Sequence, residues 1–506
     1  MRSGMHRRSD RKHEGQVASS VLRVVLVASE MAPWAKTGGL ADVMESLPPA
    51  LRRLGIDLRL ILPGYRQMLK AGIPTESIQT GFHVWLGPQR LAFAVQRIRT
   101  ETGIPIDLIV REDMFDRPNL YADSQGDYYD NAERFVFFCK ALAVWLQTWD
   151  IVPHIVHCND WHTGLIPVLL QSIPAFQSSA TLFTIHNLGY PGLFDADKFA
   201  LTGLDPNRHY RPDGLEFFGR WSMLKAGMFY SRAVSTVSPT YAREIQQQEY
   251  GRGFDGVLAA RSRSVVGILN GVDYAKWSPE RDPHIAANYS RETLSGKTAC
   301  KADLIHRCGL AADLQEQPIV GIVSRLDTQK GVDLILPILH RLVRQLGLGV
   351  VILGTGDKTL ENQLTQASDT YRRRFAFIPK FDDVLSRQIL AGADILLVPS
   401  RYEPCGLTQM YALKYGALPI VRATGGLNDT VVDADAEHET GYGFKFDHAD
   451  PQQCLSAIDR AASVYRQSPE RWKSLQHRAM SMDFSWERSA LEYQRLYRSL
   501  INNNTT

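Results

Sequence analysis

The chain has 506 residues, 44% of them hydrophobic and 22% charged, and this length fits two large domains rather than one core. The first 20 residues hold five basic and two acidic residues, so the remainder carries 52 residues of each sign. A balanced body argues against a nucleic-acid or anionic-membrane partner, which normally leaves a basic surface. No run of about 18 apolar residues is present, so we expect no membrane span.

The N-terminal 20 residues have no apolar stretch of their own and make a poor secretory signal. We interpret residues 1–20 as a disordered extension, with a short organellar transit peptide as the alternative. The six cysteines are scattered, without a C-x-x-C pair or a Cys/His metal spacing. This usage indicates a reducing cytoplasm, and we expect no metal and no cofactor.

The first half alternates short apolar runs with helix-like patterns. Strands are expected at residues 24–28, 58–62, 106–110, 155–158, 181–185 and 233–237. Helices are expected at 41–54, 131–149, 163–170 and 224–231. Such alternation predicts a parallel doubly wound sheet, in which ligands bind at the carboxyl ends of the strands.

The second half repeats this alternation after a polar, Gly- and Arg-rich stretch at 247–264, which we interpret as interdomain. Strands are expected at 319–324, 350–353, 375–378, 395–399 and 419–421. Helices are expected at 332–346 and 406–415. The sequence therefore predicts an α/β protein with two Rossmann-like doubly wound domains facing each other across a deep cleft.

The sequence Thr-Gly-Gly-Leu-x-Asp occurs at 37–42 and again at 424–429, each time after an apolar run. A glycine pair lets backbone N–H groups approach a ligand closely, and a helix N-terminus after it favours an anion. Two such loops, one in each half, suggest a phosphate-bearing ligand between two similar domains.

Two further segments of the second half follow buried strands. Arg325 and Lys330 could converge on one anion, the alternative being a solvated basic turn. Amides at 405–408 and the Thr408 hydroxyl are expected to point into the cleft. Glu403 beside them is a ligand-contacting carboxylate or a charge at a helix N-terminus. Cys405 is interpreted as a contact residue rather than a nucleophile.

In the first half, His186 ends an apolar strand, where a doubly wound sheet keeps its site. His157 and His162 are weaker candidates, because no third metal ligand accompanies them. Asp433 and Asp435 have a metal-binding spacing, but a solvated acidic loop is the preferred interpretation. The glycine pattern at 354–357 lacks the third glycine of a dinucleotide fingerprint.

Taken together, these segments resemble the bacterial glycogen synthase and plant starch synthase family. The resemblance spans roughly residues 21–490 and rests on ordered motifs at 36–43, 159–162, 186–188, 237–242, 270–273, 324–326, 403–407 and 424–427.

The resemblance implies a GT-B fold and retaining transfer of glucose from a sugar nucleotide, usually ADP-glucose, to the non-reducing end of an α-1,4-glucan such as glycogen. It divides the chain into an extension (1–20), an acceptor-side domain (21–262), a nucleotide-sugar-binding domain (263–482) and a C-terminal helix (483–506) that packs back on the first domain.

The resemblance also implies roles for individual residues. Arg325 and Lys330 would hold the diphosphate, Glu403 the glucose hydroxyls, and the His186 carbonyl would lie near the anomeric carbon, with Asp160 near the reaction centre. These five are the expected catalytic residues. The expected substrate-binding residues are Lys36, Gly38, Gly39, Asp42, Asn270, Gln329, Cys405, Gly406, Leu407 and Thr408.

Two departures from the family pattern are visible. Gly189-Tyr190-Pro191 stands where Ala-Tyr-Gln is common in the family, which affects the acceptor side. Asn428 stands where Ala is frequent, which could change the preference for the nucleotide base. Other hypotheses stay open: the same fold with glucose 1-phosphate as acceptor or a UDP-sugar donor, a nicotinamide oxidoreductase, or a non-catalytic glucan-binding protein.

Overall fold

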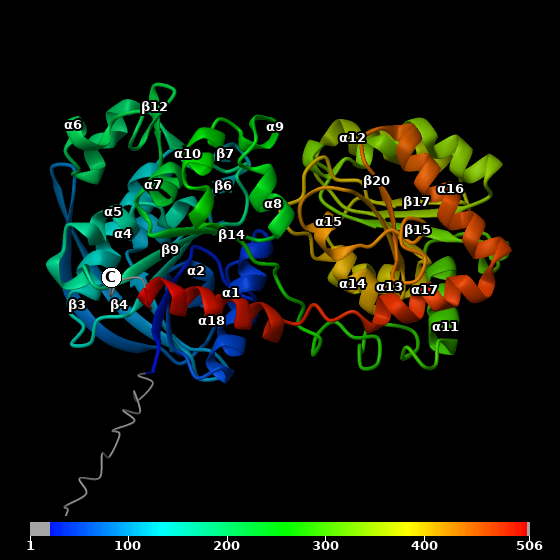
Figure 1. Cartoon of the computed structure of the whole chain (residues 1–506), viewed down its shortest axis with the longest axis horizontal. Helices are drawn as coiled ribbons and strands as arrows, with labels where there is room; N and C mark the ends of the chain where they lie inside the picture. The colour runs from blue at the N-terminus through cyan, green and yellow to red at the C-terminus, as the bar shows by residue number, and fades with distance from the viewer. Residues whose placement is uncertain (1–20, 503–506) are drawn as a thin grey trace, which may run out of the picture.

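The structure is a computed structural model that describes residues 21–502, so the expected extension at 1–20 lies outside the described residues. Figure 1 shows two units side by side, each built on a sheet that helices cover. Of the described helices, none is long and apolar enough to cross a membrane.

The first unit contains a nine-stranded sheet of order β14-β13-β9-β8-β1-β2-β5-β4-β3. All neighbouring strands pair in parallel except at the β3–β4–β5 edge, which is antiparallel. The bounds of these strands are β1 Arg23–Val27, β2 Asp57–Pro63, β3 Glu76–Leu86, β4 Gln89–Arg99, β5 Pro105–Val110, β8 Ile155–Asn159, β9 Ala180–Ile185, β13 Ala233–Thr236 and β14 Val265–Gly267.

Two small antiparallel sheets accompany this unit, formed by β6 Ala122–Asp123 with β7 Gly126–Asp127, and by β10 Leu193–Phe194, β11 Glu216–Phe217 and β12 Arg220–Ser222. Its helices are α1 Gly39–Arg53, α2 Arg66–Leu69, α3 Glu112–Phe115, α4 Asn131–Leu146, α5 Ile166–Gln171, α6 Pro206–His209, α7 Met223–Tyr230, α8 Pro239–Glu244, α9 Gln248–Gly251 and α10 Asp255–Ala260.

The second unit contains a six-stranded, all-parallel sheet of order β17-β16-β15-β18-β19-β20. Its strands are β15 Ile319–Val323, β16 Gly349–Leu353, β17 Phe375–Ile378, β18 Ile395–Val398, β19 Leu418–Arg422 and β20 Phe444–Phe446. Its helices are α11 Ser295–Arg307, α12 Lys358–Thr370, α13 Asp383–Gly392, α14 Thr408–Lys414, α15 Gly425–Thr430, α16 Pro451–Gln467 and α17 Pro469–Ser481.

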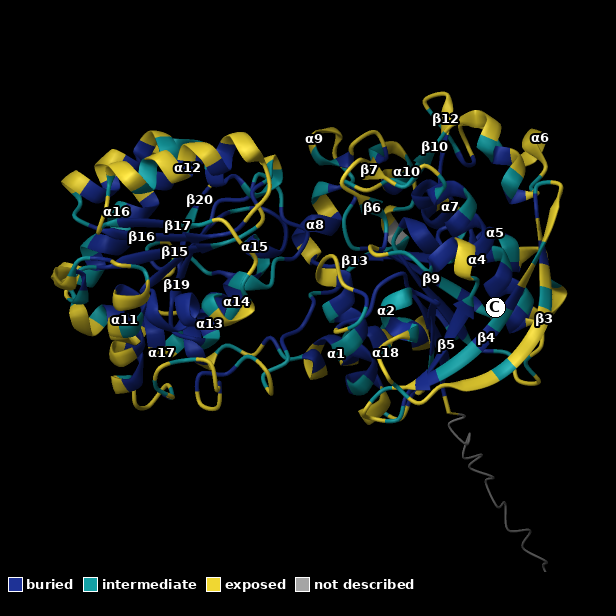
Figure 2. Ribbon diagram, turned by 180° about the vertical axis from the view of Figure 1, so that it is seen from behind, coloured by how far each residue is buried: buried dark blue, intermediate teal, exposed yellow. Residues whose placement is uncertain are grey.

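The central strands of both sheets are buried along their whole length, because helices cover both faces (Figure 2). This explains why they appear in the sequence as unbroken apolar runs rather than alternating ones. The edge strand β3 is largely exposed, and the antiparallel β3–β4 hairpin was not predicted.

The chain returns to the first unit at its end through α18 Trp486–Asn502, which packs on α1 (Figure 1). Tyr493 and Tyr497 of this helix are fully buried in the core of the first unit. The chain passes between the two units twice, after β14 and again before α18. These two connecting segments run side by side, since the Val272 N–H donates to the Phe484 carbonyl at 2.7 Å.

Two predicted features differ from the structure. The stretch at 247–264 forms short helices of the first unit, and β14 then joins the first sheet, so the expected boundary at 262/263 falls inside that unit. The helix expected at 332–346 is a 3-10 segment followed by a π segment, because Pro337 interrupts the α-helical hydrogen bonding.

Candidate active site

The carboxyl ends of β8 and β9 bring together three polar residues of the first unit. Asp160 Oδ1 accepts from the His186 N–H at 2.8 Å, and His186 Nε2 lies 2.9 Å from Asn159 Oδ1. Asp160 has φ 56° and ψ 177°, a conformation that is costly for a residue other than glycine. Such backbone strain clusters at active sites, so its position here marks this edge as a candidate site.

Burial governs the charge of these groups. It raises the pKa of Asp160 from 3.8 to about 7, although the amides of His186 and Asn187 favour the carboxylate. Burial also lowers the pKa of His186 to about 3, so this imidazole is neutral near pH 7.

The second unit presents an ion pair at the ends of β15 and β18. Lys330 Nζ lies 2.7 Å from Glu403 Oε2, and the Ser400 hydroxyl donates to the same oxygen at 2.8 Å. The Glu403 side chain is only 7% exposed, so the lysine ammonium and the hydroxyl replace its lost hydration. Gly331 follows Lys330 with φ 66°, and a Cβ there would lie 2.2 Å from the Pro399 carbonyl oxygen.

A cavity of about 190 Å³ adjoins this pair. Arg325, Lys330, Ser400 and Thr408 line it, together with residues at the ends of β15 and β18. Arg325 also lies 3.3 Å from Asp327. The predicted cationic residues therefore converge on one space, with a hydroxyl beside them.

Cys405 and Asn270, both expected to bind substrate, are not among the residues that line this cavity. Cys405 is buried, and burial raises the pKa of its thiol to about 12, so the thiol is protonated near pH 7. The Asn270 Oδ1 atom is buried without a hydrogen-bond partner among the residues that the structure describes. Gly406 has φ 74°, and Leu407 occupies the N-cap position of α14 without a side-chain cap hydrogen bond.

Gln329 connects the two units at the site. Its Nε2 donates to the Tyr402 carbonyl at 3.3 Å, and its Oε1 lies 3.5 Å from Asn187 Nδ2. Asn187 follows His186, so the two polar edges face each other.

The first glycine loop is anchored by a carboxylate that the sequence analysis did not single out. Glu30 accepts from the Thr37 N–H at 2.8 Å, from the Thr37 hydroxyl at 2.6 Å and from the Gly38 N–H at 3.1 Å. The Gly38 amide is therefore occupied in this structure. A Cβ at Gly38 or Gly39 would meet nothing within 4 Å, so the loop borders open space.

The charged residues of this loop pair with each other. Lys36 Nζ lies 2.6 Å from Asp42 Oδ1, and burial raises the pKa of Asp42 despite that cation. Both residues were expected to bind substrate, and their contact with each other was not predicted.

The second glycine loop does not border open space, which corrects the expectation of two equivalent anion loops. Glu244 of the first unit accepts from the Thr424 hydroxyl and the Gly425 N–H, both at 3.0 Å. A Cβ at Gly425 would lie 1.9 Å from the Glu403 carbonyl oxygen. In this copy the glycines let the loop pack against the Glu403 segment, and the Thr424 hydroxyl and Gly425 N–H bind Glu244 of the first unit.

The weaker candidates have structural roles. His157 hydrogen-bonds with Tyr497 and Thr184 in the core, and His162 stacks between Tyr121 and Trp161. Asp433 and Asp435 pair with nearby arginines, while residues 436–440 of the same loop are exposed. Among residues 21–502, no three His, Cys, Asp or Glu side chains form a group able to hold a metal.

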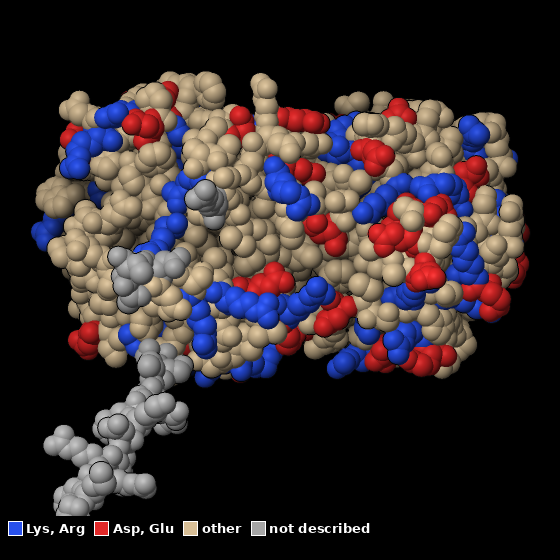
Figure 3. Space-filling view, in the orientation of Figure 1, with Lys and Arg blue, Asp and Glu red and all other residues tan. Residues whose placement is uncertain are grey.

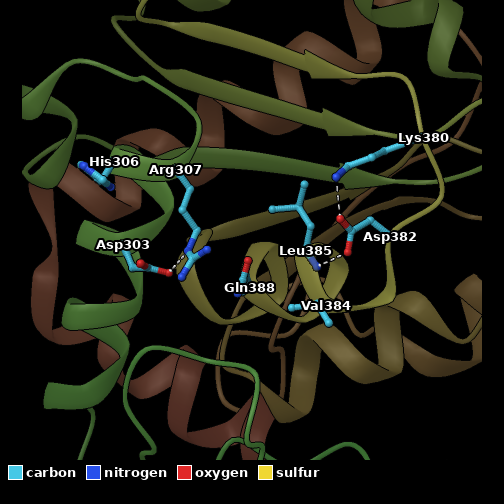
Figure 4. A pocket seen from close by; sticks show the side chains of 8 residues that line it. All are labelled: Asp303, His306, Arg307, Lys380, Asp382, Val384, Leu385 and Gln388. Carbon is cyan, nitrogen blue, oxygen red and sulfur yellow. Dashed lines mark hydrogen bonds and ion pairs between the residues drawn. The ribbon is translucent and has the colours of Figure 1, made fainter.

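A larger hollow of about 660 Å³ lies elsewhere, between the C-terminal end of α11 and the start of α13 (Figure 4). Its charged side chains already pair with each other, Asp303 with Arg307 and Lys380 with Asp382. Figure 3 shows acidic and basic side chains interspersed over one face of the molecule, without a field of a single sign there.

Comparison with known proteins gives these features a family context. Residues 23–260 match the starch synthase catalytic domain model, and 312–474 match the glycosyl transferases group 1 model. The glycogen synthase of Syntrophotalea carbinolica is 44% identical over 95% of this chain and 99% of its own length. Glycogen synthase 2 of Geobacter metallireducens is 41% identical over the same shares.

The chain belongs to the family of bacterial glycogen synthases and plant starch synthases. The catalytic domain of starch synthase IV from Arabidopsis thaliana, solved with ADP and acarbose, superposes with a TM-score of 0.87 at 34% identity, covering 96% of this chain and 100% of that one. The two-unit architecture is therefore the GT-B fold, as the sequence predicted. A sucrose-phosphate synthase from Thermosynechococcus elongatus, at 17% identity over 95% of this chain and 100% of that one and a TM-score of 0.57, shares the fold.

Proposed function

We propose that this protein transfers glucose from ADP-glucose to the non-reducing end of an α-1,4-glucan such as glycogen, with retention of anomeric configuration. The observation that carries the proposal is the convergence of Arg325, Lys330 and Thr408 on one cavity beside the buried Glu403. The ADP in the related starch synthase structure supports an adenine nucleotide as donor.

The cationic side of the cavity suits the leaving group. Negative charge grows on the diphosphate as the glycosyl–phosphate bond breaks, and preplaced Arg and Lys side chains stabilise it without reorganisation. In this proposal Arg325 and Lys330 bind the diphosphate, the Thr408 hydroxyl adds a donor, and Gly39 with Lys36 borders it from the other unit. Glu403 binds glucose hydroxyls, and Asn270, Gln329 and the 405–407 backbone complete the donor site.

The reacting sugar needs oxygen lone pairs near its oxocarbenium-like centre. The His186 carbonyl supplies one, and Asp160 holds that segment through the His186 amide. The leaving diphosphate takes the acceptor proton on the same face, so configuration is retained without a covalent glucosyl-enzyme. Detection of a glucosyl-enzyme adduct by mass spectrometry would contradict this step.

The decisive experiment is a donor and acceptor panel. ADP-glucose and UDP-glucose are each supplied with glycogen, with glucose 1-phosphate and with no acceptor. The expected result is release of ADP with growth of the polymer by α-1,4-linked glucose. Release only with UDP-glucose or only with glucose 1-phosphate favours the alternative donor or acceptor, and no release with any donor favours a glucan-binding protein.

The remaining proposals concern organisation. We assign acceptor binding to the unit of residues 21–262 together with β14. We assign nucleotide-sugar binding to the part of 263–482 that follows β14. The segment 483–506 is assigned the role of tethering the second unit to the first. We also propose a cytoplasmic location and no nucleic-acid or membrane partner, in keeping with the balanced charge of the chain after residue 20.

A further inference from the structure

Glu403 lies between two residues that the first unit holds. The carbonyl of Pro404, which follows Glu403, accepts from the Ser238 hydroxyl at 2.6 Å, and Ser238 is the N-cap residue of α8. Tyr402, which precedes Glu403, contacts the first unit through its ring and its hydroxyl. The buried carboxylate of the site therefore belongs to a short segment that meets the other unit on both sides of it.

The ring of Tyr402 faces a guanidinium group of the first unit. The Arg252 Cζ atom lies 4.6 Å from the centroid of this ring, within the range of a cation–π contact. Arg252 follows α9 and has φ 51° and ψ 31°, a left-handed conformation that glycine adopts readily and other residues rarely adopt. The strained residue is thus the one whose side chain reaches the other unit, and strain of this kind clusters at functional sites.

The hydroxyl of Tyr402 occupies the space beside Gly189. A Cβ atom at Gly189 would lie 2.9 Å from Tyr402 Oη and 2.9 Å from Asn187 Oδ1, closer than real Cβ contacts. Gly189 does not have a positive φ, so a side chain is excluded there by space and not by backbone conformation. The lack of a side chain at this position therefore lets the hydroxyl approach the loop that follows β9.

We propose that Tyr402 is a positioning residue, held between Arg252 and Gly189 of the first unit, that places Glu403 to bind the glucose of the donor. In this proposal Tyr402 acts through its neighbour in the chain and is not itself a ligand of the sugar. The residues that we assign to the diphosphate in the second unit lie in other segments, so this contact acts on the sugar side of the site. The inference rests on the proposed function for the ligand of Glu403, while the contact itself does not.

The first test reads the contact without any substrate. The full chain is labelled with 3-fluorotyrosine, and the ¹⁹F resonance of position 402 is assigned by its loss in Tyr402→Phe. Arg252→Gly removes the cation and suits the left-handed backbone, so this variant is expected to fold and to shift that resonance. An unshifted resonance would overturn the proposal.

Arg373→Gly is the matched control for this substitution. Arg373 is another exposed arginine with a left-handed backbone, φ 68°, and it lies at the amino end of β17, whereas the site lies at the carboxyl ends of β15 and β18. This variant should keep the Tyr402 resonance and the kinetic constants of the parent chain.

The second test separates the sugar from the nucleotide. Arg252→Gly is expected to lower kcat with ADP-glucose by about 2- to 5-fold, the size of one exposed cation–π contact. Arg252→Lys should recover part of this loss, because an ammonium group can also face the ring. ADP carries no glucose, so its dissociation constant, measured by calorimetry, should match that of the parent chain. An unchanged kcat, or an ADP affinity that falls as much as kcat, rejects the proposal, since the contact would then be idle or would merely hold the units together.

Gly189→Ala tests the other side of Tyr402. The added methyl group should displace the hydroxyl and lower kcat by about 10-fold, within the range of overpacking. In a Tyr402→Phe background the same substitution should cost less, because the hydroxyl is gone. An equal cost in both backgrounds would mean that the methyl group acts through Asn187 and would contradict the role of Tyr402. Inactivity of the parent chain with ADP-glucose would reject the proposed function, whereas the ¹⁹F result would still decide whether Arg252 holds Tyr402.

Discussion

At the scale of single residues, the contact between Lys330 and Glu403 neutralises both charges without ligand, and the proposed function gives each residue a second role with the ligand bound. Without ligand, each side chain neutralises the other inside a largely buried site at 2.7 Å. In the proposed function Lys330 also shares a diphosphate with Arg325, since both residues line the same cavity. The sequence indicated both residues from their positions after buried strands, but not their contact, because residues far apart in the chain meet only through the order of the strands.

Lys330→Ala is expected to lower kcat by about 10²–10³, since a charged contact to the growing negative charge is lost. Steady-state kinetics with a saturating donor measures the effect. Lys380→Ala, which removes a lysine of an exposed ion pair in the same unit, is the control and should retain activity. Near-parent turnover of Lys330→Ala would remove this residue from the proposed role.

Asp160 gives a pH-dependent prediction. Its pKa is about 7 in the folded chain and near 3.8 when unfolded, so the unfolded state ionises first as pH rises. Its contribution to folding stability therefore falls between about pH 4 and pH 7 and stays low above that range. An asparagine side chain at this position would accept hydrogen bonds from the same amides without ionising.

Asp160→Asn should accordingly raise the free energy of unfolding by a few kcal/mol at pH 8, and by progressively less toward pH 4. Urea unfolding at pH 4, 6 and 8 measures the difference. Asp127→Asn, at an exposed carboxylate of β7, serves as the reference substitution. A pH-independent difference would mean that Asp160 is ionised throughout.

Single elements depend on side chains far away in the sequence. Lys297 of α11 is buried and donates to the carbonyl oxygens of Ala391, Ala393 and Tyr415, at the ends of α13 and α14. Lys297→Met should lower the free energy of unfolding by about 3 kcal/mol or more, because each orphaned buried carbonyl costs about 1–3 kcal/mol. Lys473→Met, on the exposed face of α17, should stay within about 0.5 kcal/mol in the same denaturation experiment.

The elements also show what local pattern can and cannot predict. Buried parallel strands were predictable because both of their faces are apolar. The β3–β4 hairpin was missed because its outer strand is mostly exposed and has little apolar signal. The two glycine loops are identical in pattern and each receives a carboxylate, from Glu30 or from Glu244. They differ in use because a Cβ at Gly38 would meet nothing within 4 Å, whereas a Cβ at Gly425 would lie 1.9 Å from the Glu403 carbonyl oxygen.

At the scale of the whole molecule, α8 of the first unit is fastened to α15 of the second. Asp429 of α15 accepts from the Thr240 N–H at 2.7 Å and from the Thr240 hydroxyl at 2.6 Å. Glu244 of α8 accepts from the Gly425 N–H at 3.0 Å. Each helix thus receives a carboxylate from the other at its N-terminus. These two helices lie where the two units face each other in Figure 1, and Gly425 of α15 packs against the Glu403 carbonyl oxygen.

Because α8 is held this way, the units are expected to close around a fixed contact when nucleotide excludes water from the site. Small-angle scattering should show a smaller radius of gyration for the parent enzyme with saturating ADP than without it. Removing both carboxylates in Glu244→Ala/Asp429→Ala should enlarge the radius without ADP and lower kcat/KM for the donor, because the two polar edges then meet less often. Glu292→Ala/Asp303→Ala removes two surface ion pairs within the second unit and should leave scattering unchanged. Superimposable curves for the parent and the Glu244/Asp429 variant would show that the two crossing segments, rather than α8 and α15, set how the units are held.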